Sequence, residues 1–114
     1  MAKNLKFSIL LDTYGELLTD KQRIITGHYY DDDLSLAEIA ENEGVTRQAV
    51  RDVIHRTELQ LAAFEERLGL AERARRTADT LQQLKEIASQ EDSRLADEVC
   101  RRCDDLIKEW TKEG

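Results

Sequence analysis

The chain has 114 residues, with 17 Lys and Arg against 24 Asp and Glu, so its formal net charge at pH 7 is −7. It contains five glycines and no proline, and aromatic residues make up 5% of it. This composition favours an all-α protein with long helices, and it argues against a basic protein that binds nucleic acid over its whole surface.

The length allows one domain, or one small domain with an extension. Since no run of about 18 apolar residues is present, we expect no membrane-spanning helix. Residues 1–7 lack the apolar core of a signal peptide, so we expect a cytoplasmic protein.

The first two predicted helices cover about residues 4–16 and 20–30. Thr19 and Gln22 have the spacing of a capping box, which predicts the start of the second helix. The acidic run 31–33 ends it, and we interpret these carboxylates as solvated loop charges, because a cation site would need the alternating spacing of a calcium loop. The predicted apolar face of the first helix comprises Leu5, Phe7, Ile9, Leu10, Leu11, Tyr14 and Leu17.

Residues 35–50 carry the most specific pattern in the chain, SLAEIAENEGVTRQAV. Ser35 and Glu38 form a second capping box, which predicts a helix from residue 36 to about 42. Gly44 supplies a turn with positive φ, and Thr46 is a preferred N-cap for a helix that begins at Arg47. A short helix, a glycine turn and a second helix predict a helix-turn-helix.

The helix that begins at Arg47 has no evident stop before Gly69. Its apolar positions, three or four residues apart, are Val50, Ile54, Thr57, Leu61, Phe64 and Leu68. A helix of that length spans roughly 33 Å, which is too long for a recognition helix alone. We therefore expect its C-terminal half to pack against another part of the protein.

Residues 70–114 form a helical extension to the helix-turn-helix domain of residues 1–69. The polar stretch 89–93 separates two predicted helices, each with a narrow apolar face. Such helices must pack on the preceding long helix, on each other or on a second chain. We expect this extension to support a homodimer.

The candidate nucleic-acid-binding residues lie early in the helix that begins at residue 47. They are Arg47, Gln48, Arg51, His55 and Arg56. Between residues 46 and 56, three Arg oppose one acid, Asp52, for a local charge of +2. Arg can bind guanine and Gln can bind adenine in a DNA major groove. The alternatives are a solvated face whose Arg side chains pair with nearby Glu, and a face that binds an acidic protein or RNA phosphates.

Other chemistry has little support in the sequence. Cys100 and Cys103 form a CxxC inside a helical pattern, which indicates reduced structural thiols, with an intermolecular metal clip as the alternative. His28 is interpreted as a packed helix residue. No phosphate-binding loop or nucleophile motif is present, so we expect no enzyme activity, no metal and no cofactor.

Three segments carry a family resemblance, LLDTYGELLTDKQ, HYYDDDLSLAEIA and VTRQAVRDVIHRTE. Over residues 5–70 the chain resembles the YlxM-like proteins of Gram-positive bacteria, a family similar to sigma-factor region 4. The resemblance implies a cytosolic helix-turn-helix protein, encoded beside the signal recognition particle GTPase, that modulates that pathway. Where the family tends to carry an aromatic residue after RQAV, this chain has Arg51, which makes the exposed face more basic.

Two functional hypotheses follow from these observations. The first is a regulator that binds double-stranded DNA or signal recognition particle RNA, which the local +2 favours. The second is an adaptor that binds the signal recognition particle GTPase without DNA, which the overall charge of −7 favours.

Overall fold

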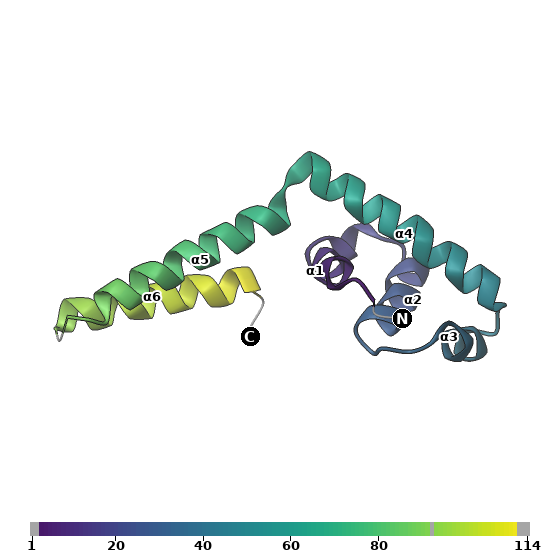
Figure 1. Cartoon of the computed structure of the whole chain (residues 1–114), viewed down its shortest axis with the longest axis horizontal. Helices are drawn as coiled ribbons and strands as arrows, with labels where there is room; N and C mark the ends of the chain where they lie inside the picture. The colour runs from purple at the N-terminus through teal and green to yellow at the C-terminus, as the bar shows by residue number, and fades with distance from the viewer. Residues whose placement is uncertain (1–2, 92, 112–114) are drawn as a thin grey trace. The chain divides into compact units, whose positions relative to one another are not determined.

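The computed structural model describes residues 3–91 and 93–111, and within them every regular element is helical. The helices are α1 (Leu5–Tyr14), the 3₁₀ helix η1 (Gly15–Leu17), α2 (Asp20–Tyr30), α3 (Leu36–Glu43), α4 (Arg47–Leu68), α5 (Leu70–Ala88) and α6 (Arg94–Thr111) (Figure 1). The all-α prediction is confirmed. None of the helices in these ranges combines the length and apolarity needed to cross a bilayer.

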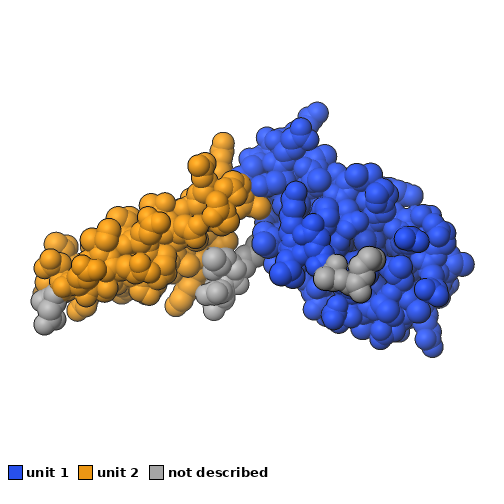
Figure 2. All heavy atoms as spheres, viewed as in Figure 1, with its two compact units in different colours: residues 1–69 blue, residues 70–114 orange. Residues whose placement is uncertain are grey.

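The chain divides into two compact units, residues 1–69 and residues 70–114 (Figure 2). Unit 1 contains α1 to α4, and unit 2 contains α5 and α6. Each unit has its own packing.

The helix-turn-helix of unit 1 is built from local hydrogen bonds. Ser35 Oγ accepts from the backbone N–H of Glu38 at 3.1 Å, and a Glu38 carboxylate oxygen accepts from the N–H of Ser35 at 3.2 Å. Gly44 ends α3 in the left-handed conformation at φ +66°, and Thr46 Oγ1 caps α4 by accepting from the N–H of Ala49 at 3.0 Å. These contacts confirm the predicted helix-turn-helix.

A buried apolar cluster joins α2, α3 and α4. It consists of Ile25, Ile39, Ala40, Val50 and Ile54. Apolar side chains that are only partly buried pack around it, including Tyr29, Tyr30 and Leu36. The cluster takes side chains from one face of α4 and leaves the opposite face of its first turns exposed.

The end of α1 differs from the prediction. The helix stops at Tyr14 rather than near Glu16, because the chain tightens into η1, where the N–H of Leu18 donates to the carbonyl of Gly15 at 3.1 Å. The apolar face is also narrower than predicted, since Leu10, Leu11 and Tyr14 are buried while Leu5, Ile9 and Leu17 are exposed.

The C-terminal half of α4 packs against α1, which accounts for its length. The phenol of Tyr14 donates to Glu65 at 2.6 Å, and the rings of Tyr14 and Phe64 are 5.7 Å apart. α4 is continuous over 22 residues and ends at Gly69, whose φ is +61°. Leu68 is exposed, unlike the rest of the predicted apolar series.

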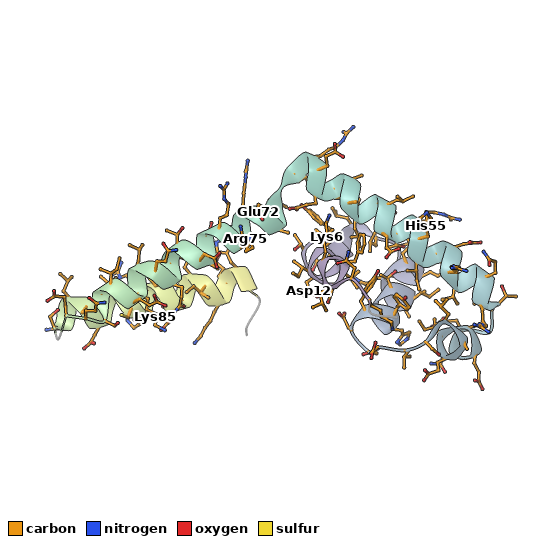
Figure 3. All side chains as sticks on the ribbon, in the orientation of Figure 1. Lys6, Asp12, His55, Glu72, Arg75 and Lys85 are labelled. Atoms are coloured by element: carbon orange, nitrogen blue, oxygen red, sulfur yellow. The ribbon has the colours of Figure 1, made fainter. Side chains whose placement is uncertain are left out.

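Unit 2 is an antiparallel hairpin of α5 and α6 (Figures 1 and 3). Lys85 Nζ of α5 lies 2.8 Å from Asp104 of α6, and the Sγ–H of Cys100 donates to the carbonyl oxygen of Lys85 at 3.5 Å. Ala96 and Cys103 are its buried side chains among the described residues, and α5 contributes none.

Two glycines test how far the backbone conformation determines stability. Gly44→Ala should lower the free energy of unfolding by about 1–2 kcal/mol, because a Cβ is costly at a positive φ. Gly27→Ala is the matched control, since Gly27 lies inside α2 and a Cβ there meets nothing within 4 Å. It should raise the free energy of unfolding by about 0.5–1 kcal/mol. Urea unfolding followed by circular dichroism measures the free energy of unfolding of both variants. A change of the same sign in both would contradict the assignment of Gly44 to a turn that requires positive φ.

Candidate nucleic-acid interface

All five candidate residues are exposed on the first three turns of α4. The helix is held in place by Val50 and Ile54, which are buried in the cluster with α2 and α3. Because successive residues are about 100° apart on a helix, these two anchors determine the direction of every neighbouring side chain.

The five residues divide between two sides of α4. Arg47, Arg51 and His55 follow one another at intervals of four residues, so they form a row along one side of the helix. Arg56 is about 140° around the helix from Arg51, on the other side. The structure therefore brings three of the five residues, Gln48, Arg51 and His55, together on a shared groove. Arg47 continues the row beyond the groove, and Arg56 lies apart.

This groove has a volume of about 420 Å³ and lies where α4 meets α2 and α3. Its apolar part comes from Tyr29, Leu36 and Ile54. Its polar part comes from Gln48, Arg51, Asp52, His55 and Glu58. Arg51 stands against the carboxylates of Asp52 and Glu58, so the formal charge of the groove residues is −1 with His55 counted as neutral.

The arginines of α4 are available for a ligand. Arg47, Arg51 and Arg56 make no ion pair within the described ranges, whereas Gln48 donates to Asp52 at 3.0 Å. In unit 2 several arginines are paired instead. Arg75, Arg101 and Arg102 each pair with a carboxylate three or four residues away on their own helix. The arrangement expected for a merely solvated Arg–Glu face is therefore found on unit 2.

The neighbouring helix α3 is acidic. Glu38, Glu41 and Glu43 are exposed on it, and it contains no Lys or Arg. In a helix-turn-helix docked on a duplex, the first helix crosses the phosphate backbone. These carboxylates would therefore oppose the approach of a phosphate that the arginines of α4 attract.

Lys3, which sequence reasoning missed, holds the loop that joins α2 to α3. Its Nζ donates to the carbonyl oxygens of Tyr29 at 2.6 Å and Leu34 at 2.7 Å. It also lies 3.2 Å from Asp33 and 3.9 Å from the centre of the Tyr29 ring. A cation at the end of α2 is favourable because unpaired carbonyl groups point out there.

The acidic run 31–33 has structural partners. Asp31 accepts from Ser8 Oγ at 3.2 Å, and Asp32 lies 2.9 Å from Nδ1 of His28, which is half-buried. Over residues 3–91 and 93–111, no group of three or more His, Cys, Asp or Glu side chains could hold a metal ion. Cys100 and Cys103 are free thiols, and Cys103 is buried in the hairpin.

A second contact missed in the sequence ties the groove to α2. The Tyr30 phenol donates a hydrogen bond to Glu58, one of the groove residues. Burial raises the pKa of Tyr30, and the hydrogen bond to Glu58 raises it further. The phenol therefore stays protonated and keeps donating throughout the physiological pH range.

Comparison with known proteins places this geometry in a family. A family model described as "Putative helix-turn-helix protein, YlxM / p13 like", named UPF0122, matches residues 1–108. A UPF0122 protein of Geobacillus kaustophilus is 43% identical over 109 residues, which cover 93% of this chain and 98% of that protein.

Two further relatives agree. A UPF0122 protein of Shouchella clausii is 44% identical over 106 residues, covering 92% of this chain and 91% of its own. One from Clostridium kluyveri is 53% identical over 72 residues, and the match spans 63% of this chain and 65% of that protein's length. The chain belongs to the UPF0122 family of YlxM-like helix-turn-helix proteins.

Proposed function

We propose that this protein is a cytoplasmic, non-enzymatic regulator that binds double-stranded DNA through the first turns of α4. The observation that carries the proposal is the set of exposed arginines on that segment, Arg47, Arg51 and Arg56, which make no ion pair within the described residues. An exposed guanidinium without an internal carboxylate partner can bind a phosphate or a guanine without breaking an existing contact.

The position of each residue along α4 suggests its role. Residues at the N-terminus of a recognition helix contact base edges, so Arg47, Gln48 and Arg51 are assigned to base recognition. His55 and Arg56 lie a turn further along and on different sides of the helix, where they are assigned to the flanking phosphates. Gln48 would have to exchange its hydrogen bond to Asp52 for one to a base.

Signal recognition particle RNA is the second nucleic acid to test. The major groove of A-form RNA is too narrow for a helix, so α4 could use only a loop, a bulge or phosphates there. Fluorescence anisotropy with labelled duplex DNA and labelled particle RNA over a salt series compares the two ligands. A linear fall of log affinity with log salt gives the number of phosphate contacts, with a slope of about −0.9 per contact for duplex DNA. Absence of binding to either ligand at low salt would contradict the proposal.

The variant Arg47→Ala/Arg51→Ala tests the assigned residues. It should abolish measurable duplex binding, since each lost base contact costs about 1–3 kcal/mol. Helicity should stay unchanged, because both side chains are exposed. The matched control is Arg75→Ala/Arg101→Ala, which removes the same charge from residues already paired on unit 2. Equal loss of affinity in the two variants would show that only net charge matters.

The acidity of α3 favours a second candidate function, an adaptor that binds the signal recognition particle GTPase and modulates its pathway. Glu38, Glu41 and Glu43 occupy the helix that would cross the DNA backbone, where a dedicated DNA-binding protein commonly places basic side chains. An acidic helix beside a groove of mixed charge suits a basic protein surface.

Removal of one of these carboxylates measures their effect on DNA affinity. Glu41→Gln should tighten duplex binding at low salt by about two- to fivefold, because a negative charge near the phosphates is removed. Glu66→Gln is the control, since it makes the same charge change at the other end of α4. If both variants bind like the parent chain, α3 does not approach the duplex.

Co-elution with the GTPase distinguishes the two functions. Under the adaptor hypothesis, Arg47→Ala/Arg51→Ala should still co-elute with the signal recognition particle GTPase on a sizing column. Loss of co-elution would show that the partner uses the arginine side of α4, and failure of the parent chain to co-elute would exclude this partner.

We assign residues 70–114 to the support of a homodimer. Dimeric helix-turn-helix proteins place two recognition helices on two half-sites of a duplex. A dimer would thus offset the weak attraction of a single acidic chain by doubling its contacts.

A further inference from the structure

The α5–α6 hairpin has one polar side. Lys85 and Asp104 form an ion pair across the two helices at 2.8 Å, and Cys100 donates to the Lys85 carbonyl beside them. Gln82 is exposed and lies about 60° around α5 from Lys85, in the direction away from Leu84. This side of the hairpin presents polar groups that water can solvate, so no partner is needed to bury it.

The other side of the hairpin exposes large apolar side chains from both helices. The exposed fractions are 48% for Leu84, 65% for Ile87, 73% for Leu95, 37% for Leu106 and 43% for Trp110. We call these five residues the open face.

Helix geometry places the open face on one side. With about 100° between successive residues, Leu84 is about 100° around α5 from Lys85, and Leu106 is about 160° around α6 from Asp104. Both rotations have the same sense, and in antiparallel helices the same sense leads to the same side of the pair. Leu84 and Leu106 are therefore both turned away from the Lys85–Asp104 ion pair, toward one side of the hairpin. Leu95, Leu106 and Trp110 lie within an arc of about 60° on α6, so they form one stripe along the helix.

The hairpin is too thin to bury this stripe. Its buried side chains among the described residues are Ala96 and Cys103, both small. Two helices that bury only small side chains against each other gain little from their packing, and helical bundles reach stability by adding further helices to the apolar side. The open face therefore requires an occupant.

Charges at one end of the open face indicate what the occupant is. Around α5, Arg73 falls between Leu84 and Ile87, and Arg76 lies about 20° beyond Ile87. Asp105 and Glu109 lie on the outer edge of the face along α6. Because the helices are antiparallel, the two pairs are at the same end of the hairpin. Within the described residues Arg73 and Glu109 make no ion pair, and the contacts of Arg76 and Asp105 are long, at 3.9 and 3.7 Å.

We propose that a second copy of the chain covers the open face, with α5 of each copy packed antiparallel on α6 of the other in a four-helix bundle. A twofold axis parallel to the helices places Arg73 and Arg76 of each copy next to Asp105 and Glu109 of the other copy. The bundle therefore contains two such contacts between opposite charges. The inference rests on the dimer-supporting role proposed for residues 70–114 and is independent of whether the protein binds DNA.

The first test is the mass of the full-length chain in solution by light scattering, without nucleic acid. The expected result is twice the mass of one chain at concentrations of about 10–100 μM. Trp110 is the single tryptophan, so its emission should shift to the blue and its quenching by acrylamide should fall as the dimer forms. A monomer throughout this range, or a larger assembly, would overturn the proposal.

Charge exchange tests the arrangement of the helices. Arg73→Glu/Arg76→Glu and Asp105→Arg/Glu109→Arg should each weaken self-association at least tenfold, because like charges then face each other. An equimolar mixture of the two variants should recover dimers, since every edge then meets its complement. Unchanged self-association of both variants, or a mixture that stays monomeric, would overturn the proposed arrangement.

Leu84→Asp, with Gln82→Asp as the control on the polar side, tests the open face itself. Leu84→Asp should remove the dimer, whereas Gln82→Asp should keep it. If the two variants form dimers to the same extent, the assignment of the open face as the dimer contact is wrong. A dimer that fails to bind duplex DNA would leave this inference intact and would count against the DNA-binding proposal alone.

Discussion

The contact of α4 with α2 and α3 controls how every group on α4 is presented. Val50 and Ile54 pack with Ile25, Ile39 and Ala40, and the left-handed turn at Gly44 sets the approach of α3 to α4. A helix has no freedom to rotate one residue without rotating the next, so burial of these two side chains directs Arg51 and His55 to the groove. The same burial directs Arg56 to the other side. The packing of the unit 1 core thus determines how the side chains of the candidate site are oriented.

The electrostatics of unit 1 are decided locally. At physiological ionic strength charges separated by more than about 8 Å are largely screened, so the net charge of −7 acts mainly through the groups nearest a ligand. The arginines of α4 attract phosphate, and the glutamates of α3 repel it. The acidic α3 lies next to the basic first turns of α4. The two proposed functions could therefore act together, because a partner that covered α3 would remove the repulsion.

The two units reach stability by different means. Unit 1 buries large side chains such as Tyr14, Ile25 and Leu61 completely, and long-range hydrogen bonds from Tyr14 and Tyr30 join its helices. Unit 2 buries only small side chains within the described residues and relies on ion pairs within and between its helices, which contribute little when exposed. Because its own core is so small, unit 2 is the part of the chain where an intermolecular contact is expected.

The sequence by itself determined the helix-turn-helix, because capping boxes, an N-cap and a glycine turn are interactions between residues three or four positions apart. It also indicated the break between α5 and α6 and the candidate residues of α4. Only the tertiary structure showed where α1 ends, which of its apolar residues are buried, and which candidate residues line the groove with α2 and α3. Lys3, Tyr14 and Tyr30 bind groups 26 to 51 residues away. Such contacts leave no periodic signal in a single sequence, since they depend on how helices pack rather than on how each one forms.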